Sequence, residues 1–224
     1  MKRWCIPPHQ QAAFVCAMED VLDLYEAPDD PQRPLVCFDE MPYQLVSEAR
    51  PALPAHPGQV GRQDYEYHRE GTAHLFLHFA PQRGWRHVAV TVRRTNADFA
   101  EQLRVLVDEH YPEAVSIRVV LDNLSTHTGA ALYETFAPAE AWRIWRKLEF
   151  HYTPRHGSWL NQAEIELSVL SGQCLDRRIG DRATLASEIA AWEQQCNQAQ
   201  ATVHWRFTTA QARVKLHRVY PAHS

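Results

Sequence analysis

The sequence VVLDNLSTH, at residues 119–127, indicates a buried strand that carries a carboxylate to its own end. An apolar run from Ile117 to Leu121 leads directly into Asp122, and the residues that follow are polar or turn-forming. Continuous apolar runs are typical of strands buried on both faces, and ligands in open α/β sheets bind outside the carboxyl ends of such strands. Alone, an Asp-Asn pair at this place would more often be a turn or a helix cap. A functional role for Asp122 therefore depends on partners elsewhere in the chain.

Length and composition indicate one large domain with terminal helical extensions. The chain has 224 residues, enough for a core of ordinary size. Hydrophobic residues at 45% and charged residues at 22% are typical of globular rather than disordered chains. No apolar run reaches the roughly 18 residues of a membrane span, and residues 1–10 lack the apolar stretch of a secretory signal. The five cysteines form no CxxC pair, so we expect reduced thiols in a cytoplasmic protein.

Charge is distributed unevenly along the chain. A net charge of −4 argues against a protein that binds nucleic acid over its whole surface. Residues 83–94 nevertheless contain four arginines and no acid, and residues 202–224 contain four Lys or Arg residues and no acid. Such segments fit a protein that touches phosphate on one face only. A merely solvated basic surface explains each segment equally well.

Apolar periodicity and turn residues predict a mixed sheet with helices packed on it. The first half of the chain should form a helix at 9–27, a strand at 35–38 that ends at Asp39, a Pro/Gly-rich connection at 41–71, and an antiparallel hairpin of 72–80 and 85–92. A helix at 96–110, the strand before Asp122, a helix-rich segment at 128–146 broken at Pro138, and a strand at 148–152 should follow. The last elements should be a helix within 157–175 that carries Glu164, a helix capped by Asp181, and a short helix at 209–217. A connection as long as 41–71 is usually functional or mobile. In the second hairpin strand Arg86 alternates with apolar residues, which predicts one exposed side.

Three acidic residues stand out in this arrangement. Asp39 and Asp122 follow apolar strands, and Glu164 lies in the first turn of a predicted helix. Phosphoryl transfer on nucleic acid uses two divalent cations about 3.5–4 Å apart, and carboxylates are ligands that Mg²⁺ accepts. Two carboxylates 4 Å apart would repel by roughly 4 kcal/mol at an effective dielectric near 20. Such a cluster therefore implies a bound metal or raised pKa values.

The role of Glu164 has two alternatives at this point. Asn161 and Glu164 have the spacing of a capping box, in which the glutamate only satisfies a backbone amide. Glu166 is a rival metal ligand, but two residues along a helix correspond to about 200° of rotation. Only one of the two glutamates can face the site, and spacing alone does not decide between them.

The three acidic blocks resemble those of a DDE transposase, in the branch of bacterial insertion sequences related to mariner elements. The first block is CFDE at 37–40, the second is VVLDNLSTH, and the third is HYTPRHGSWLNQAEIELSVL at 151–170. In that family the second aspartate is followed by Asn and, a few residues later, by His, and the third acid follows a Pro-x-x-Ser-x-x-Leu-Asn segment. The matching positions here are Asp122, Asn123, His127, Pro154, Ser158, Leu160, Asn161 and Glu164. The resemblance covers roughly residues 4–221.

The resemblance implies that Asp39, Asp122 and Glu164 bind two Mg²⁺ or Mn²⁺ ions and that Glu166 faces elsewhere. It also implies an RNase H-like fold, a mixed five-stranded sheet flanked by helices, in which the two aspartate-bearing strands lie side by side. The expected boundaries are an N-terminal helical linker at 1–33, a catalytic domain at 34–200 and a basic C-terminal helical tail at 201–224.

The implied activity is metal-dependent cleavage of DNA at element ends, followed by strand transfer into target DNA. The implied partners are double-stranded DNA and a second copy of the chain, and the implied location is the cytoplasm, at the nucleoid. A general nuclease of the same fold is an alternative. A non-catalytic remnant that acts as a DNA-binding or interaction module is another, although the intact acidic triad argues against it.

Two features depart from the family pattern. The gap between Asp122 and Glu164 is 41 residues, longer than is usual in mariner-type enzymes, and the surplus can lie in the helical segment after Pro138. Such transposases also carry an N-terminal helix-turn-helix region that recognises element ends, and this chain starts too late to contain it. Either that region is supplied as a separate polypeptide, or the chain is an isolated catalytic part.

Further polar residues are candidates for supporting roles. Asn123 and His127 could orient a metal-bound water or contact phosphate, with local turn and capping duty as the alternative. A second group is considered for contact with DNA. The residues before the Glu164 helix lie at its N-terminus, which suits phosphate binding, and the arginines after the hairpin would touch the DNA backbone. The members of that group are Arg93, Arg94, Arg155, His156, Trp159 and Asn161.

Overall fold

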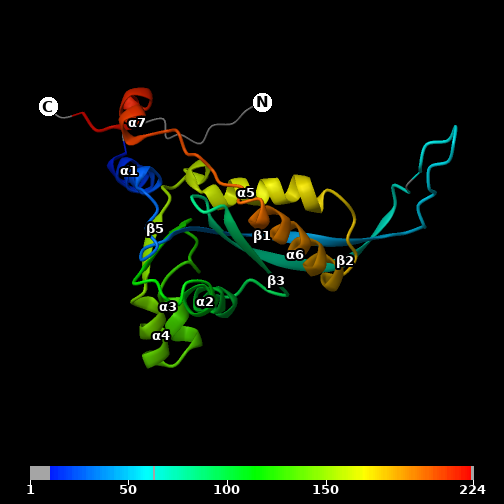
Figure 1. The fold of residues 1–224 in the computed structure, drawn as a ribbon, viewed down its shortest axis with the longest axis horizontal. Coiled ribbons are helices and arrows are strands. Elements are labelled where there is room, and N and C mark those ends of the chain that lie inside the picture. Colours follow the sequence, from blue (N-terminus) through cyan, green and yellow to red (C-terminus); the bar gives the residue numbers. More distant parts are fainter. Residues whose placement is uncertain (1–10, 63, 223–224) are drawn as a thin grey trace.

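A single mixed sheet organises the chain in the computed structural model, which describes residues 11–62 and 64–222. Its strand order is β3-β2-β1-β4-β5 (Figure 1). The strands are β1 (Leu35–Glu48), β2 (Tyr67–Ala80), β3 (Trp85–Thr91), β4 (Ile117–Leu121) and β5 (Leu148–Tyr152). β2 is antiparallel to both β1 and β3, whereas β1, β4 and β5 run parallel. The predicted mixed five-stranded sheet is confirmed, and the strands that carry Asp39 and Asp122 are neighbours.

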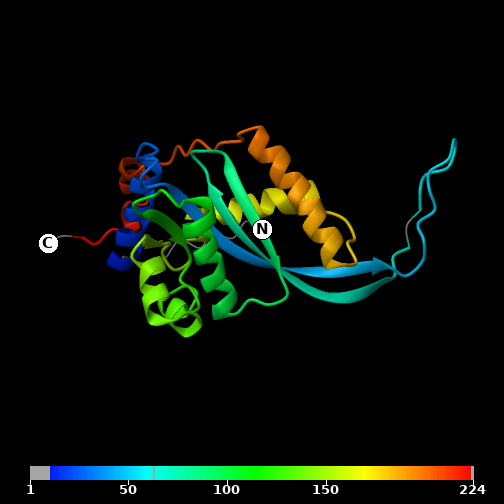
Figure 2. The ribbon, with the colours of Figure 1, turned by 60° about the horizontal axis from the view of Figure 1, so that its bottom comes forward.

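Helices cover both faces of the sheet and bury two separate cores (Figures 1 and 2). One face carries α2 (Asn96–Val105), α3 (Ala130–Thr135) and α4 (Pro138–Trp145). The other carries α5 (Gln162–Leu170) and α6 (Arg182–Gln198), while α1 (Ala12–Glu26) lies near β5 and packs against α7 (Thr209–Lys215). Short π-helical turns, Leu106–His110 and Ser171–Leu175, extend α2 and α5, and 3-10 turns occupy Ser158–Leu160 and His217–Val219. None of the helices in the described part is both long and apolar enough to cross a membrane.

Most predicted elements lie where the apolar pattern placed them. All five residues of β4 are buried, as expected for an inner strand between two helical layers. The residues of α1 that face the core are those predicted, Phe14, Met18, Val21, Leu22 and Tyr25. The helix begins at Ala12, and the start predicted at residue 9 lies outside the described residues, as do Cys5 and the segment 1–10. Thr95 rather than Asn96 caps α2, through a capping box with Asp98.

The prediction for residues 35–71 was wrong in its middle part. Asp39 does not end a strand, because β1 continues to Glu48 and pairs with β2 through Glu48 and Tyr67. The two strands form a ribbon that projects from the body, and among its described residues those at the tip, 49–62 and 64–66, lack regular strand pairing (Figure 2). Pro42 suggested a break, but β1 pairs with β4 only as far as Cys37, so the ribbon is an edge where proline is tolerated.

Arg86 corrects the prediction of an exposed side on β3. It is 1% exposed, and its guanidinium lies 2.6 Å from the Glu166 carboxylate. The rings of Phe79 and Trp192 flank the guanidinium carbon at 5.1 and 5.8 Å. Helix α6 covers this part of the sheet, which the alternation of residues in β3 alone could not indicate.

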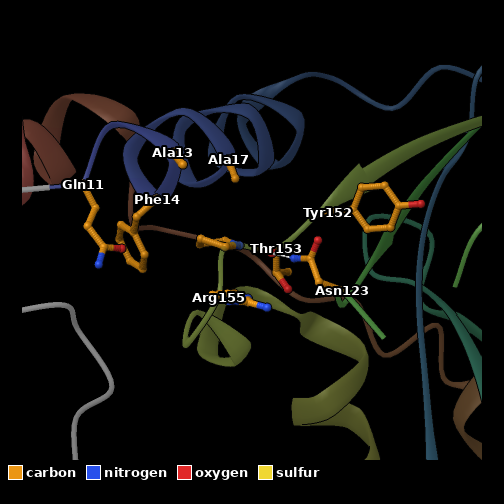
Figure 3. Close-up of a pocket in the computed structure, with 9 residues that line it drawn as sticks. Gln11, Ala13, Phe14, Ala17, Asn123, Tyr152, Thr153 and Arg155 are labelled. Atoms are coloured by element: carbon orange, nitrogen blue, oxygen red, sulfur yellow. Dashed lines mark hydrogen bonds between the residues drawn. The ribbon is translucent and has the colours of Figure 1, made fainter. Parts of the chain in front are cut away.

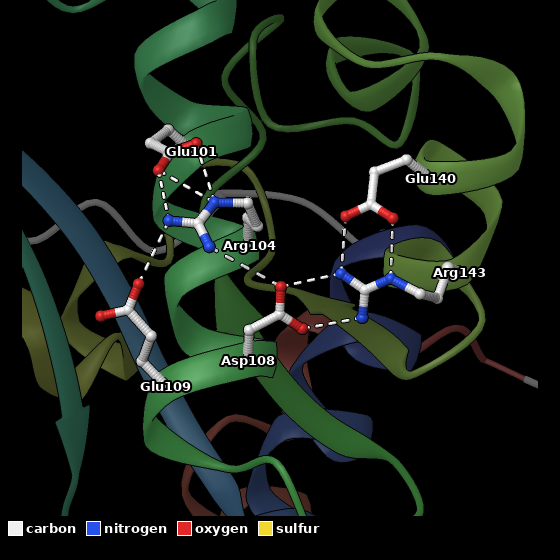
Figure 4. A network of polar contacts seen from close by, with 6 residues as sticks. All are labelled: Glu101, Arg104, Asp108, Glu109, Glu140 and Arg143. Atoms are coloured by element: carbon white, nitrogen blue, oxygen red, sulfur yellow. Dashed lines mark hydrogen bonds and ion pairs between the residues drawn. The ribbon is translucent and has the colours of Figure 1, made fainter.

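A network of partly exposed ion pairs links the end of α2 to α4 (Figure 4). Asp108 accepts two hydrogen bonds of 2.7 Å from Arg143, and Arg104 lies 3.7 Å from the same carboxylate. Glu101 and Glu140 pair with Arg104 and Arg143 within their own helices. Bidentate geometry is the strong form of such a contact, and the Arg143 hydrogen bonds hold the pKa of Asp108 below its ordinary value despite partial burial. Through these ion pairs α4, which lies in the long segment between Asp122 and Glu164, is held on the sheet face opposite α5.

A buried histidine should make stability depend on pH. His78 is fully buried, and among the described residues neither of its ring nitrogens has a partner. Burial, together with the neighbouring His87 and His110, lowers the pKa of His78 well below its ordinary value. Its ring therefore stays neutral in the folded state, whereas the unfolded chain binds a proton below about pH 6.5. The contribution of His78 to the free energy of unfolding should therefore fall by about 1.4 kcal/mol per pH unit as the pH drops from about 6.5 to 5.

Urea unfolding between pH 5 and 8 measures this dependence. The difference in free energy of unfolding between the wild type and a His78→Leu variant should show this slope, whereas the difference between the wild type and His68→Gln, which changes an exposed histidine on the ribbon, should not. Equal slopes in the wild type and His78→Leu would contradict the prediction.

Candidate active site

The three predicted metal ligands come from three different elements on the same side of the sheet's end. The register that pairs Cys37 with Val120 places Asp39 of β1 level with Asp122, which directly follows β4. Glu164 lies on the exposed side of the first turn of α5. Burial raises the pKa of Asp39 to about 7; the Glu40 backbone amide opposes this, while the charges of Asp122, Glu40 and Glu164 raise it further. The structure thus brings the three acids within electrostatic reach of one another.

These acids do not form a closed metal cage. Across residues 11–62 and 64–222, no three His, Cys, Asp or Glu side chains are placed to coordinate one ion. Their chemistry nevertheless suits a hard divalent cation, because all three offer carboxylate oxygens. A cation would also offset the burial and the neighbouring negative charges that together raise the pKa of Asp39. The residues therefore fit Mg²⁺ or Mn²⁺.

The geometry decides between Glu164 and Glu166. Glu166 is 6% exposed and its carboxylate is paired with Arg86 inside the protein. Within the described part of the chain Glu164 makes no hydrogen bond or ion pair, and its charge acts on Asp39. The capping-box alternative is not observed, because the Asn161 backbone amide donates to the Ser158 carbonyl at 2.8 Å rather than to Glu164, and the Asn161 side chain alone caps α5, accepting from the Ala163 amide at 3.1 Å.

Asn161 is buried and holds Asp39. Its side-chain amide donates to the Phe38 carbonyl at 3.1 Å and to Asp39 Oδ2 at 3.2 Å. The Glu40 backbone amide donates to the other Asp39 oxygen at 2.8 Å. At 1% exposure, Asn161 is placed to fix α5 against β1 and to orient Asp39, rather than to meet DNA as the sequence suggested.

His127 lies between two carboxylates. Its Nδ1 is 2.6 Å from Asp122 Oδ1, at an angle unsuited to a hydrogen bond, and its Nε2 is 2.9 Å from Glu40 Oε2. Burial lowers the pKa of His127, but Asp122 and Glu40 outweigh it and raise that pKa to about 9. For Asp122 burial acts in the opposite direction and raises the pKa, but the contact with His127 outweighs burial, so the pKa of Asp122 is lowered overall. Sequence reasoning missed Glu40, although an acid inside an apolar strand next to Asp39 was a usable signal.

The loop before α5 borders Asp122 and is tightly built. The Gly157 amide donates to the Pro154 carbonyl at 2.8 Å, and a Cβ on Gly157 would lie 2.5 Å from the Pro154 ring. His156 adopts a left-handed backbone with φ 63°, a strained conformation that is concentrated at functional sites. Arg155 and His156 are exposed here beside Asp122. The loop thus presents two basic side chains at the candidate site.

The other residues considered for DNA contact differ in their surroundings. Trp159 stacks edge-on against Phe207 with ring centroids 5.8 Å apart, which ties it to the C-terminal segment. Arg93 is exposed at the end of β3. Arg94 lies 3.4 Å from Glu40 while 40% of its side chain remains exposed. Arg93 and Arg94 are therefore on the surface, and Arg94 also balances a buried acid.

A hollow of about 440 Å³ adjoins the site between α1 and the end of β5 (Figure 3). Phe14 and Ala17 of α1 form one wall, and Thr153, Arg155 and Asn123 form the other. Asn123 donates to the Thr153 carbonyl at 2.5 Å, so it joins the loop after β4 to the segment after β5. This contact gives Asn123 a local structural role next to Asp122.

A mixed sheet that places two acids level at adjacent parallel strands, with a third on a following helix, is the arrangement expected of a metal-dependent nuclease. A family profile described as DDE superfamily endonuclease matches residues 34–186, and the chain belongs to that family. No curated protein matches the chain.

Solved structures share the fold. The mariner Mos1 paired-end complex with Mn is 16% identical with a TM-score of 0.58, covering 89% of this chain and 62% of that one. The Mos1 paired-end complex with Mg is 15% identical with a TM-score of 0.56, and the match covers 99% of this chain and 67% of that one. The Mos1 strand transfer complex is 14% identical with a TM-score of 0.55, and the match covers 92% of this chain and 66% of that one. This chain thus spans about two thirds of the Mos1 chain, and the predicted RNase H-like fold is confirmed.

Proposed function

We propose that this chain is the catalytic domain of a DNA transposase, which cleaves DNA at element ends and joins the freed end to target DNA. The observation that carries the proposal is the placement of Asp39 and Asp122 level on adjacent parallel strands, with the charge of Glu164 acting on Asp39. The family assignment supports endonuclease chemistry. The Mos1 structures, described as paired-end and strand transfer complexes, support transposition as its setting.

In this proposal each residue has a defined task. Asp39, Asp122 and Glu164 would hold two divalent ions, and Asn161 would keep Asp39 turned toward them. The bound ions supply nucleophile activation and stabilisation of the leaving oxygen. Arg155 and His156 lie on an exposed loop beside Asp122, where they would bind the phosphates that flank the scissile bond. No side chain is required to form a covalent bond to DNA.

The partners are proposed on the same basis. Double-stranded DNA would lie over the exposed edge that carries Arg93, Arg155, His156 and Trp159. Two copies would act on one DNA assembly, since two element ends must be joined, and a helix-turn-helix region would recognise those ends. Such a protein would work in the cytoplasm at the nucleoid. Residues 1–33 would act as a linker and residues 201–224 as a basic tail.

The test is nicking of DNA that carries the element's own ends, with Mg²⁺ or Mn²⁺ and with the upstream region supplied. Asp39→Asn, Asp122→Asn and Glu164→Gln should each lose roughly 10³-fold in rate, which corresponds to about 4 kcal/mol. Glu149→Gln, which removes a β5 carboxylate that pairs with Arg33, should cut normally. Absence of metal-dependent cutting by the intact chain would refute the proposal, and cutting that ignores end sequence would favour a general nuclease.

A further inference from the structure

Glu40 is a buried acid that adjoins the candidate metal site without being one of its three predicted ligands. Its side chain is 1% exposed. Successive residues of a strand point to opposite faces, so Glu40 and Asp39 face different sides of β1. Glu40 Oε2 lies 2.9 Å from His127 Nε2, and Oε1 lies 3.4 Å from Arg94 Nη1. The Glu40 side chain therefore contacts His127 and Arg94, while its backbone amide donates to Asp39.

His127 joins Glu40 to Asp122 and has little freedom to move. The ring is 1% exposed and packs against Phe38 and Phe99, with ring centroids 5.4 and 4.8 Å apart. Its backbone is also held, because the Tyr152 hydroxyl donates to the His127 carbonyl at 2.7 Å. Each ring nitrogen faces a different carboxylate, so rotation of the ring would leave a buried charge unpaired, which is strongly unfavourable.

Asp122 is consequently held by one of its two oxygens. Oδ1 lies 2.6 Å from His127 Nδ1 and accepts from the Leu124 amide at 3.1 Å. Within the described part of the chain Oδ2 has no such contact, which leaves it available toward the site. The order Arg94, Glu40, His127, Asp122 is thus a chain of alternating charges that runs from the surface to a proposed metal ligand.

We propose that Glu40 is a positioning residue for the two-metal site, acting through His127 to hold Asp122 with one oxygen engaged and the other directed at the cation. This inference rests on the proposed function. Partners behind a metal ligand fix its orientation, and their loss typically weakens metal affinity by 10- to 100-fold. A merely structural ion pair would instead affect stability and leave metal affinity unchanged.

Two substitutions of different severity separate these roles. Glu40→Gln keeps the side-chain volume and an oxygen that can accept from His127 Nε2, but removes the charge. Glu40→Leu removes both the charge and the acceptor. Glu149→Gln is the matched control, because it also removes a carboxylate from a pair with an arginine, at 2.7 Å, but on β5 and away from the site.

The experiment is calorimetric titration of the DNA-free protein with Mn²⁺, together with thermal unfolding in the absence of metal. We expect the affinity for Mn²⁺ to fall about 3- to 10-fold in Glu40→Gln and about 10- to 100-fold in Glu40→Leu, with no change in Glu149→Gln. If Glu40→Leu does not fold, Glu40→Gln carries the test. Unchanged Mn²⁺ affinity in a folded Glu40 variant overturns the inference, whatever its melting temperature.

Failure of the inference can be distinguished from failure of the proposed function. If the wild type binds Mn²⁺, Asp39→Asn does not, and the Glu40 variants bind like the wild type, only the role of Glu40 is refuted. If the folded wild type binds no Mn²⁺, the two-metal proposal fails and the role of Glu40 fails with it.

Discussion

Glu166→Ala should lower the free energy of unfolding by roughly 3 to 5 kcal/mol, whereas Glu164→Ala should change it by less than about 0.5 kcal/mol. The two glutamates are two residues apart on α5 but have opposite environments. Removing Glu166 leaves the Arg86 guanidinium charged and buried, at 1% exposure, between two aromatic rings. Removing Glu164 leaves no buried charge without a partner, because Glu164 is exposed. Urea unfolding at pH 8 measures both, and the nicking assay should show loss of activity for Glu164→Ala at unchanged stability.

The partner side of the pair offers the control for this prediction. Arg86→Ala should destabilise by a similar amount, since it leaves the Glu166 carboxylate buried and also removes hydrogen bonds to the Gly84 and Ala201 carbonyls. The double variant Arg86→Met, Glu166→Leu should recover most of the loss, because a buried ion pair replaced by apolar groups of similar volume is often tolerated. A Glu166→Ala protein as stable as the wild type would show that the pair contributes nothing.

The sequence predicted those elements whose pattern is local. Strand β4 and helix α1 follow from continuous or periodic apolar residues, and both are confirmed. Asp181 caps α6 as predicted, because its hydrogen-bonding geometry repeats in many helices, whereas for α2 the sequence left Thr95 and Asn96 open and the structure has Thr95. Carboxylates after apolar runs and at a helix start pointed to positions 39, 122 and 164, and the resemblance to DDE transposases, rather than spacing, chose Glu164 over Glu166.

What the sequence did not predict depends on contacts between distant segments. The length of β1 is set by its pairing with β2, across residues that contain Pro42, so local turn signals pointed the wrong way. Arg86 is buried because α6, about a hundred residues later, packs against β3. Glu40 is buried by His127 in the same manner. In each case a residue that is polar or breaks a strand by itself is accommodated by a partner that only the folded chain supplies.

Asp39→Asn should make the metal-free protein more stable at pH 8 while abolishing cleavage. Burial, reinforced by the charges of Asp122, Glu40 and Glu164, raises the pKa of Asp39 from 3.8 to about 7, with the Glu40 amide opposing it. Between these values the unfolded chain has lost its proton while the folded chain retains it, so this group's contribution to stability falls as the pH rises from about 4 to 7. Above pH 7 the full penalty is present, and asparagine, which does not ionise, escapes it.

The expected gain is about 1 to 2 kcal/mol. One pKa unit corresponds to about 1.4 kcal/mol, but Asp39 is only partly buried. The asparagine amide must also face either the Glu40 amide or the Asn161 amide, both of which now donate to Asp39. An unsatisfied donor of this kind costs about 1 kcal/mol or more, which reduces the gain. Subtracting the variant's stability from that of the wild type at each pH isolates Asp39 from the opposite trend caused by His78.

Metal addition completes this prediction. A ligand that binds only the folded state stabilises it by RT ln(1 + [L]/Kd), about 2.7 kcal/mol at one hundred times Kd. Mn²⁺ should therefore raise the unfolding midpoint of the wild type at pH 8 and leave that of Asp39→Asn nearly unchanged, so that the order of stabilities reverses when metal is added. The reversal follows because the buried, mutually repelling carboxylates that destabilise the metal-free fold attract a divalent cation. A variant less stable than the wild type without metal would show that the charge of Asp39 does not destabilise the fold. Equal stabilisation of the two proteins by Mn²⁺ would show that Asp39 is not a metal ligand.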